Sequence, residues 1–262
     1  MLVSHPAFRE IFPWLAAVLG LCLGSFYSVC AHRYLTGASI VRPGSHCPAC
    51  KTPLSALELV PVASWLLLRG RCRSCGARIP ALYPALELAS GLWAYLAALK
   101  FGPGPLFFFL MAMGGIYLVA SMIDLDSFIL PNRLTIPAAI LALAGAAFLP
   151  HVSLSGALIG AGVGYVLFWG LAKAYLAVKG VDGLGGGDVK LMLSIGALVG
   201  WRGLSFAVLM GSLAALIASP VFLRASGGEK NSIPIPFGPF LCFGAMAQAL
   251  YGPEIQAAIA AI

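Results

Sequence analysis

Long apolar segments that are almost free of charge recur along this sequence, and they constrain its fold more than any other feature. The segments fall at residues 12–31, 83–100, 105–123, 132–149, 154–178, 189–200, 204–223 and 237–251. A helix needs about 20 apolar residues to cross a hydrocarbon layer of about 30 Å. Strands of a membrane barrel alternate apolar and polar residues, and these segments do not. The sequence therefore predicts an all-α polytopic membrane protein of about eight transmembrane helices.

The gaps between these segments predict how the chain is divided. Most gaps are short and rich in Gly or Pro, such as Trp201-Arg202-Gly203, or polar, as at residues 224–234. One gap is much longer and predicts a sizeable insert outside the membrane. We therefore expect three parts: residues 1–32 with a periplasmic N-terminus and the first helix, an insert at residues 33–82, and a helical bundle at residues 83–262.

Basic residues predict the orientation of this bundle. If the N-terminus is outside and the insert inside, only Arg9, Lys100 and Arg202 of the 16 Lys and Arg residues lie on the outer side. Such a bias is typical of membrane proteins whose basic loops face the cytoplasm. The formal charge of +7 therefore indicates membrane orientation. Basic and aromatic residues are not interleaved as in nucleic-acid-binding proteins, so we expect no nucleic-acid partner.

Four of the seven cysteines form two Cys-x-x-Cys pairs inside the insert, Cys47 with Cys50 and Cys72 with Cys75. Two such pairs about 20 residues apart are typical of a structural zinc site, in which four thiolates surround one Zn²⁺ ion. Disulfides are the alternative, but thiols stay reduced on a cytoplasmic face. His46 is a possible competing ligand, although a solvated role suits it better.

Two aspartates stand where a long apolar segment meets a polar loop. Asp124 follows the third segment, and Asp188 ends the run Gly185-Gly186-Gly187 before the sixth. Carboxylates in such places are costly to desolvate and mark functional sites. The number of spans between them places both on the inner side, where they could share one proton and one water. Asp124 and Asp188 are therefore the predicted catalytic pair of an aspartic protease.

The residues around Asp188 also have a predicted purpose. Without Cβ atoms, Gly185, Gly186 and Gly187 let a substrate backbone approach closely and allow positive φ angles. Lys190 is predicted to support the same site, with a snorkelling inner anchor as its alternative role. These four residues are the expected substrate or loop support.

Each aspartate also has a purely structural interpretation. Asp124 could pair with Arg133, and Asp188 could be the N-cap of the next helix, a position that Asp favours. Asp126 competes with Asp124, but residues two apart on a helix point about 200° apart, so only one of them can face Asp188. Asp182 is interpreted as a solvated loop residue.

Several short motifs, taken in order, match one known family over nearly the whole chain. They are Gly24-Ser25-Phe26, His32-Arg33, Cys47-Pro48-Ala49-Cys50, Pro61-Val62-Ala63-Ser64-Trp65, Arg69-Gly70-Arg71-Cys72-Arg73-Ser74-Cys75-Gly76, Tyr83-Pro84-Ala85-Leu86-Glu87, Asp124 seven residues before Pro131, Gly185-Gly186-Gly187-Asp188-Val189-Lys190 and Pro236-Phe237-Gly238-Pro239. In these motifs the chain resembles the type IV prepilin peptidases, a family of polytopic aspartic proteases of the bacterial inner membrane.

This resemblance implies a function. It maps the family's catalytic aspartates onto Asp124 and Asp188 and its cysteine tetrad onto the four cysteines of the insert. Prepilin and pseudopilin precursors would be cleaved after a glycine at the cytoplasmic boundary. The new N-terminus would then be methylated with S-adenosylmethionine, although the insert shows no nucleotide fingerprint and the residues of a cofactor site stay unknown. A peptidase without methyltransferase activity and a proton-coupled transporter are the alternatives.

Overall fold

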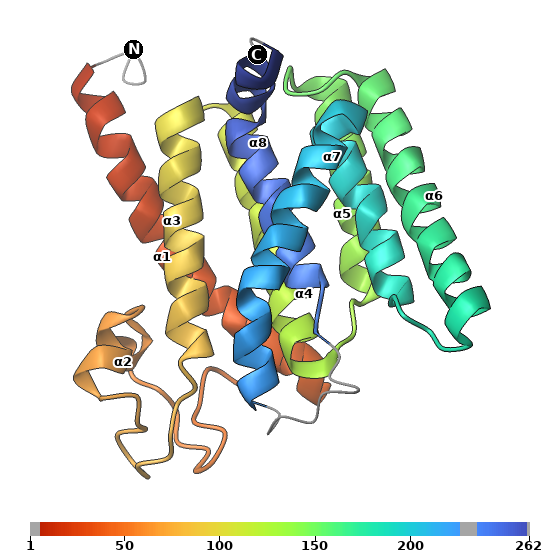
Figure 1. The fold of residues 1–262 in the computed structure, drawn as a ribbon. Helices are drawn as coiled ribbons and strands as arrows, with labels where there is room; N and C mark the ends of the chain where they lie inside the picture. The colour runs from red at the N-terminus through yellow and green to blue at the C-terminus, as the bar shows by residue number, and fades with distance from the viewer. Residues whose placement is uncertain (1–5, 226–234, 261–262) are drawn as a thin grey trace. The chain divides into compact units, whose positions relative to one another are not determined.

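A computed structural model describes residues 6–225 and 235–260 of the chain, and these residues are folded almost entirely into helices (Figure 1). The long helices are α1 (Pro6–Thr36), α3 (Leu82–Phe101), α4 (Pro105–Ser127), α5 (Asn132–Phe148), α6 (Leu154–Lys179), α7 (Gly186–Ala225) and α8 (Gly238–Ala260). The insert carries the 3-10 helix η2 (Ala56–Leu59) and the short helix α2 (Ala63–Leu67). No strand occurs in the described ranges, where the insert has only isolated bridge pairs.

The predicted polytopic membrane fold is confirmed by the length and apolar character of these helices. Five helices in the described part of the chain, α1, α3, α4, α6 and α7, are long and apolar enough to cross a membrane. Helix α5 is apolar but has only 17 residues, which corresponds to about 26 Å at 1.5 Å per residue. Part of the polar break expected at residues 224–234 lies outside the described residues.

The sixth and seventh predicted segments together make up α7, which consists of two helical halves on either side of a kink at Gly200. Gly200 has φ 69° and ψ 170°, a combination that only glycine adopts readily. The break was expected at Trp201-Arg202-Gly203, and this position is wrong by one residue. Trp201, Arg202 and Gly203 already belong to the second half of α7, because the backbone turn is complete at Gly200.

Helix α1 extends beyond the apolar segment at residues 12–31 and continues to Thr36. Arg33 was expected to open the insert, but it lies in the last turn of α1 and is buried. Its guanidinium donates to the carbonyl oxygens of Ser39, Pro43 and Gly44 at 2.6, 2.6 and 3.2 Å. The first loop of the insert is thus wrapped around a helix-terminal arginine.

The chain forms two compact units, residues 1–123 and residues 124–262, with the division inside α4. In the first unit α1 packs closely along α3: a Cβ added to Gly24 would lie 2.7 Å from the Cα of Glu87. The Trp93 indole on α3 donates to the carbonyl oxygen of Leu110 on α4 at 3.0 Å. These two units are defined by packing, whereas the three parts expected from the sequence are defined by the membrane and the insert. The three-part division stays a prediction.

In the second unit α7 packs against α5, α6 and α8. A stripe of glycines on α6, at positions 156, 160 and 164, faces residues 200, 196 and 192 of α7 in antiparallel order. The backbones touch so closely that a Cβ on Gly160 would collide with the carbonyl oxygen of Gly196, and one on Gly196 with that of Gly160. Small residues at a helix interface are what allow such close approach in membranes. This contact holds the half of α7 that begins with Asp188.

Candidate active site and metal centre

Asp124 lies in the last turn of α4 and is buried, with 5% of its surface exposed. Its Oδ2 accepts a hydrogen bond of 3.1 Å from the backbone N–H of Gly238, the first residue of α8. The N–H groups of a first helical turn have no partner within their own helix, so a carboxylate is a natural acceptor for them. The start of α8 therefore holds and orients the Asp124 carboxylate.

Asp188 lies in the first turn of α7, where its N–H donates to the carbonyl oxygen of Gly185 at 3.0 Å. Since the helix begins at Gly186, the alternative in which Asp188 is the N-cap is wrong. Its Oδ1 is buried and has no hydrogen-bond partner among the described residues. A buried polar oxygen without a partner is costly, so this oxygen has the capacity to accept a further hydrogen bond.

The structure brings the two carboxylates close enough for their charges to interact. Leu130, buried in the loop between α4 and α5, lies against backbone from both sides. A Cβ added to Gly187 would lie 2.7 Å from the Leu130 Cβ, and one on Gly238 would lie 2.8 Å from its Cδ1. Leu130 is therefore the packing element between the start of α7 and the start of α8.

The competing acidic residues lie elsewhere. Asp126 is exposed, whereas Asp124 is buried, as the angle between residues two apart on a helix requires. Asp182 lies in the loop between α6 and α7 and is exposed. Lys190 donates from Nζ to Oδ1 of Asn132 at 2.9 Å, which ties the first turn of α7 to the first residue of α5.

The three glycines before Asp188 are not equivalent. None of them has a positive φ, so the expected left-handed backbone is absent from Gly185, Gly186 and Gly187. The reason is that α7 already begins at Gly186, and the positive φ of this connection falls on Gly180 at the end of α6. Among the described residues, a Cβ on Gly186 would meet nothing within 4 Å, whereas Gly187 is closed off by Leu130. Open space in this loop thus lies at Gly186.

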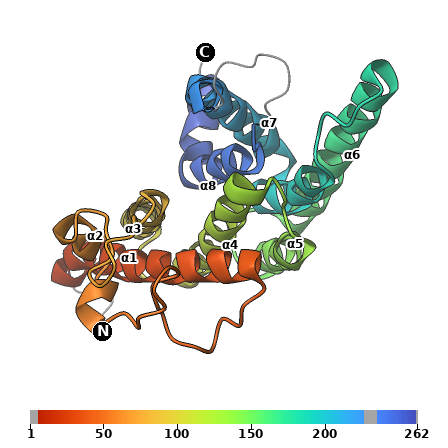
Figure 2. The ribbon, with the colours of Figure 1, turned by 90° about the horizontal axis from the view of Figure 1, so that it is seen from below.

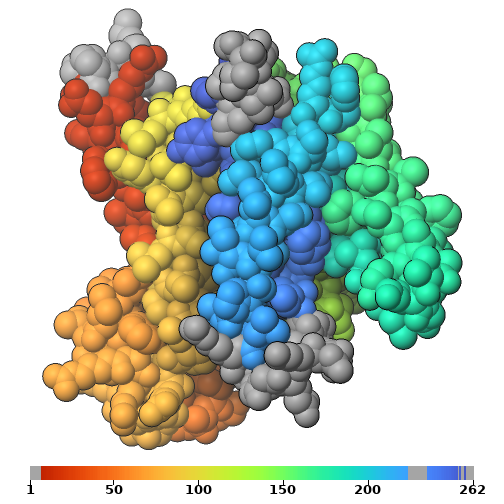
Figure 3. All heavy atoms as spheres, in the orientation of Figure 1, coloured from red at the N-terminus to blue at the C-terminus, as the bar shows by residue number. Residues whose placement is uncertain are grey.

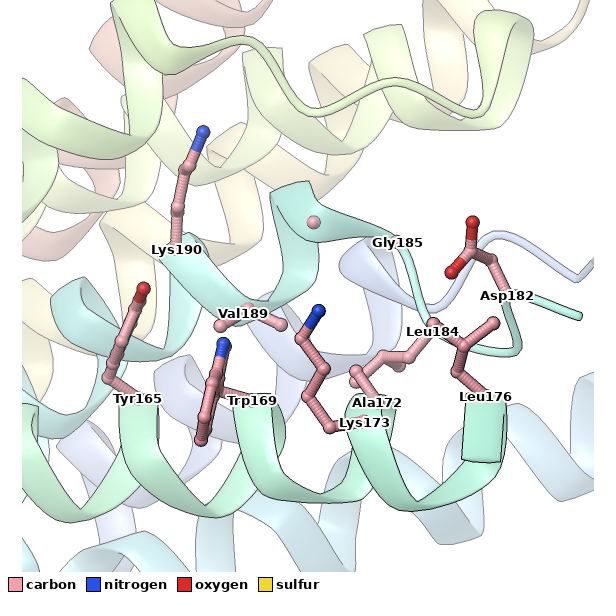
Figure 4. A pocket seen from close by; sticks show the side chains of 11 residues that line it. Tyr165, Trp169, Ala172, Lys173, Leu176, Asp182, Leu184, Gly185, Val189 and Lys190 are labelled. Carbon is pink, nitrogen blue, oxygen red and sulfur yellow. The ribbon is translucent and has the colours of Figure 1, made fainter. Parts of the chain in front are cut away.

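A cavity of about 400 Å³ opens beside this loop (Figure 4). It lies between α6, the loop and the first turn of α7, and Trp169 points from α6 toward Val189 of α7 (Figure 4). The lining residues are Tyr165, Trp169, Ala172, Lys173, Leu176, Asp182, Leu184, Gly185, Gly186, Val189 and Lys190. Neither Asp124 nor Asp188 lines this cavity, although the lining residues Gly186 and Val189 lie close to Asp188 in the first turn of α7.

The four cysteines of the insert form one cluster whose sulfur atoms all lie within 4.8 Å of one another. The sulfurs of Cys47 and Cys75 are 3.9 Å apart. A tetrahedral zinc ion about 2.3 Å from each sulfur would separate them by about 3.8 Å. Hydrogen bonds with Thr52 lower the pKa of the Cys50 thiol to about 6. The pKa of Cys75 rises to about 11 despite a backbone hydrogen bond from Ala77, because burial and the neighbouring cysteines raise it, so without a metal the four thiols do not ionise alike. The cluster can hold a metal ion.

The two halves of this cluster have the same backbone pattern. In each half the first cysteine donates its N–H to the carbonyl oxygen five residues on, Cys47 to Thr52 at 3.0 Å and Cys72 to Ala77 at 2.8 Å. The residue after the second cysteine, Lys51 or Gly76, has a positive φ and donates back to the first. Two equivalent turns therefore present their sulfurs to one point.

Sequence reasoning missed two residues of the aspartate site, Gly238 and Leu130. Gly238 stands in the motif Pro236-Phe237-Gly238-Pro239, for which the sequence alone suggests no role. Its contact with Asp124 spans 114 residues of the chain. The signal was a glycine directly at the start of an apolar segment, where a side chain would obstruct a close backbone contact.

Comparison with known proteins covers most of the chain. Residues 18–101 match the family model described as Bacterial Peptidase A24 N-terminal domain, and residues 111–219 match that of the Type IV leader peptidase family. A protein of Stutzerimonas stutzeri is 36% identical over 98% of this chain and 95% of its own length. One of Aeromonas salmonicida (strain A449) is 33% identical over 93% of both chains. Both are named prepilin leader peptidase/N-methyltransferase. No solved structure matches the chain significantly.

Proposed function

The chain belongs to the type IV leader peptidase family, and from this premise we propose that it is a membrane aspartic endopeptidase that removes the leader of type IV prepilins and pseudopilins. The bond cleaved follows a glycine at the point where the substrate's hydrophobic helix begins. This bond lies outside a fully formed helix, so little unwinding is needed before hydrolysis. The basic residues of the loops support an inner-membrane protein whose active site faces the cytoplasm.

We assign the hydrolysis to Asp124 and Asp188. The ionised member of the pair takes a proton from water, and the water oxygen attacks the scissile carbonyl carbon. The protonated member gives its proton to the carbonyl oxygen, and a tetrahedral intermediate forms. Its collapse breaks the C–N bond: the proton taken from water passes to the leaving nitrogen, and one hydroxyl proton of the intermediate returns to the other aspartate as the C=O bond re-forms. The observation that carries this assignment is the buried, unpartnered Oδ1 of Asp188 within electrostatic reach of Asp124.

The loop before Asp188 suits the approach of a peptide. Gly186 offers open space, and the adjoining cavity is lined by apolar, aromatic and charged side chains. We propose that the substrate backbone passes over Gly185 and Gly186, while Lys190 holds the first turn of α7 through Asn132. Gly187 supports the loop by packing on Leu130.

We also propose that the chain methylates the new N-terminus, as the names of its relatives indicate for those proteins. S-adenosylmethionine would supply the methyl group, and we assign no residues to its binding. A peptidase without this second activity is the alternative. The four cysteines would hold a structural zinc ion, because their sulfur spacing fits a tetrahedral ion.

The test is to incubate the purified protein with a prepilin, with and without S-adenosylmethionine, and to measure the mass of each product. We expect cleavage in both samples and one additional methyl group only with S-adenosylmethionine. Asp124→Asn and Asp188→Asn should each lower the cleavage rate at least about 100-fold, because each removes a proton-transfer group.

Asp126→Asn is the matched control, since this neighbouring carboxylate is exposed. It should cleave at the normal rate and unfold at the same temperature as the two other variants. Normal cleavage by either Asp124→Asn or Asp188→Asn would refute the catalytic pair. Cleavage without any methylation would leave the peptidase and remove the second activity.

A further inference from the structure

The insert exposes large apolar side chains in a part of the chain that lies outside the membrane-spanning helices. Leu57 on η2 and Leu66 and Leu67 on α2 are 77%, 61% and 83% exposed. Lipid covers such side chains on a spanning helix, but these three residues lie between the spans α1 and α3. Exposed apolar groups that gather on one short segment mark an interaction surface.

A hydrogen bond fixes the position of the segment formed by η2 and α2 along the axis of α3. The N–H of Val62, between η2 and α2, donates to Oε2 of Glu87 at 2.7 Å. Glu87 is buried and follows the first residue of α3, Leu82, by five residues, which is about 7.5 Å along the helix axis. The segment therefore lies beside the second turn of a membrane-spanning helix. In both Figure 1 and Figure 2, α2 lies next to the insert end of α3.

The segment is also held so that its apolar side chains stay outward. The Trp65 indole on α2 donates to the carbonyl oxygen of Ile79 at 3.1 Å. Gly70 lies under the same ring, since a Cβ there would be 2.9 Å from Trp65 Cζ2. Because Trp65 anchors the inner side of α2, the leucines that follow it face away from the insert. Figure 3 shows the insert as a lobe that continues from α3 and protrudes at its end.

Charge decides what kind of surface fits this lobe. Four exposed arginines follow α2, at positions 69, 71, 73 and 78. The only acidic residue between α1 and α3 is Glu58, whose Oε2 accepts from both the N–H and the hydroxyl of Ser55 at 2.9 and 2.7 Å. A basic leader peptide would be repelled here, whereas anionic phospholipid headgroups would be attracted.

We propose that residues 56–67 form an interfacial anchor, which inserts Leu57, Leu66 and Leu67 into the leaflet on the insert's side of the membrane. Arg69, Arg71 and Arg73 then contact the anionic headgroups of the same leaflet. An apolar face buried roughly 5–10 Å below the headgroups is the depth expected of such elements, and it agrees with the Val62–Glu87 contact. The anchor holds the metal cluster of the insert at a fixed height above the bilayer, whatever reaction the chain catalyses.

The test places the photoreactive residue p-benzoylphenylalanine at position 67 of the full chain in nanodiscs of equal parts phosphatidylglycerol and phosphatidylcholine. After irradiation, mass spectrometry identifies what is attached. We expect phospholipid adducts at position 67 and at position 57, at least about threefold above those at Ala49, an exposed position in the first cysteine turn. Adducts to a second copy of the chain or to added prepilin, or no adducts above those at Ala49, would overturn the anchor.

A second measurement tests the charge contacts on the same sample. Phosphatidylglycerol should exceed phosphatidylcholine among the adducts at position 67 at least about twofold, because arginines concentrate anionic lipid around them. The double change Arg71→Gln and Arg73→Gln should remove this excess while leaving the total adducts unchanged. An equal ratio in the unchanged chain would overturn the headgroup contacts. Metal content per chain, measured for every variant, shows that the insert stays folded.

Discussion

At the scale of single residues, the aspartate site depends on backbone groups as much as on side chains. Asp124 is held by the N–H of Gly238, and Asp188 lies in the first turn of α7, directly after Gly185, Gly186 and Gly187. A glycine at position 238 is required for space, because a Cβ there would lie 2.7 Å from Asp124 Oδ2. The Asp124 carboxylate can therefore occupy its position only because Gly238 has no Cβ atom.

Gly238→Ala should impair cleavage without unfolding the protein. The added methyl group pushes on the Asp124 carboxylate and on Leu130, and a displacement of about 1 Å at a catalytic group can cost about 100-fold in rate. The measurement is kcat on a prepilin substrate together with thermal unfolding. Gly162→Ala is the matched control, since a Cβ there meets nothing within 4 Å. An unchanged kcat for Gly238→Ala would show that Asp124 does not need this support.

The sequence was informative about which residue types mattered and less so about their partners. The angular argument favoured Asp124 over Asp126, and the burial of the first and exposure of the second agree with it. The doubled Cys-x-x-Cys spacing predicted a cluster that the structure assembles. The Gly238 contact could not be predicted, because a hydrogen bond across 114 residues leaves no local pattern. The catalytic roles themselves stay predictions.

At the scale of helices, the α6–α7 contact depends on which glycines face it. Gly160 is in the contact, where a Cβ would lie 2.7 Å from the carbonyl carbon of Gly200 and still closer to Gly196. Gly162, two residues further along α6, faces open space. These two positions share a helix and a residue type but differ in packing, so they form a natural pair for comparison.

Gly160→Ala should destabilise the protein by about 1–3 kcal/mol, the usual cost of overpacking a close contact. Gly162→Ala should be neutral or stabilise it by up to about 1 kcal/mol, because alanine is the better helix former. Thermal or denaturant unfolding of both variants in the same detergent checks this difference. Equal stability of the two variants would mean that α6 and α7 do not approach as closely as described.

Helix positions were predicted well because the length of each apolar segment can be read directly from the sequence. Helix ends were predicted less well. The first apolar segment ends at residue 31, whereas α1 continues to Thr36, because Arg33 stays in the last turn of the helix and its side chain holds the following loop by hydrogen bonds. The break in α7 was misplaced by one residue because only the backbone angles of Gly200 decide it.

At the scale of the whole molecule, removing the metal ion from the cysteine cluster should affect the insert and not the rest of the chain. Chelation of the bound metal should loosen residues 45–78 and leave α5, α6 and α7 unchanged, since the cluster belongs to the first compact unit. Hydrogen–deuterium exchange followed by mass spectrometry measures this. The amides of Cys47 and Cys72 should exchange faster, because the turns they close are no longer joined. Unchanged exchange after complete metal loss would contradict a structural role.

The break at Gly200 is a pivot about which the first half of α7 can rotate. From Gly200 back to Asp188 the first half of α7 is about 18 Å long, at 1.5 Å per residue. A swing of about 10° at this fulcrum displaces the Asp188 end by about 3 Å, which is the length of a hydrogen bond. A small change in the two torsion angles of one glycine can therefore change the distance between the carboxylates of Asp188 and Asp124. The close contact between the glycine stripe of α6 and the first half of α7 restrains this rotation.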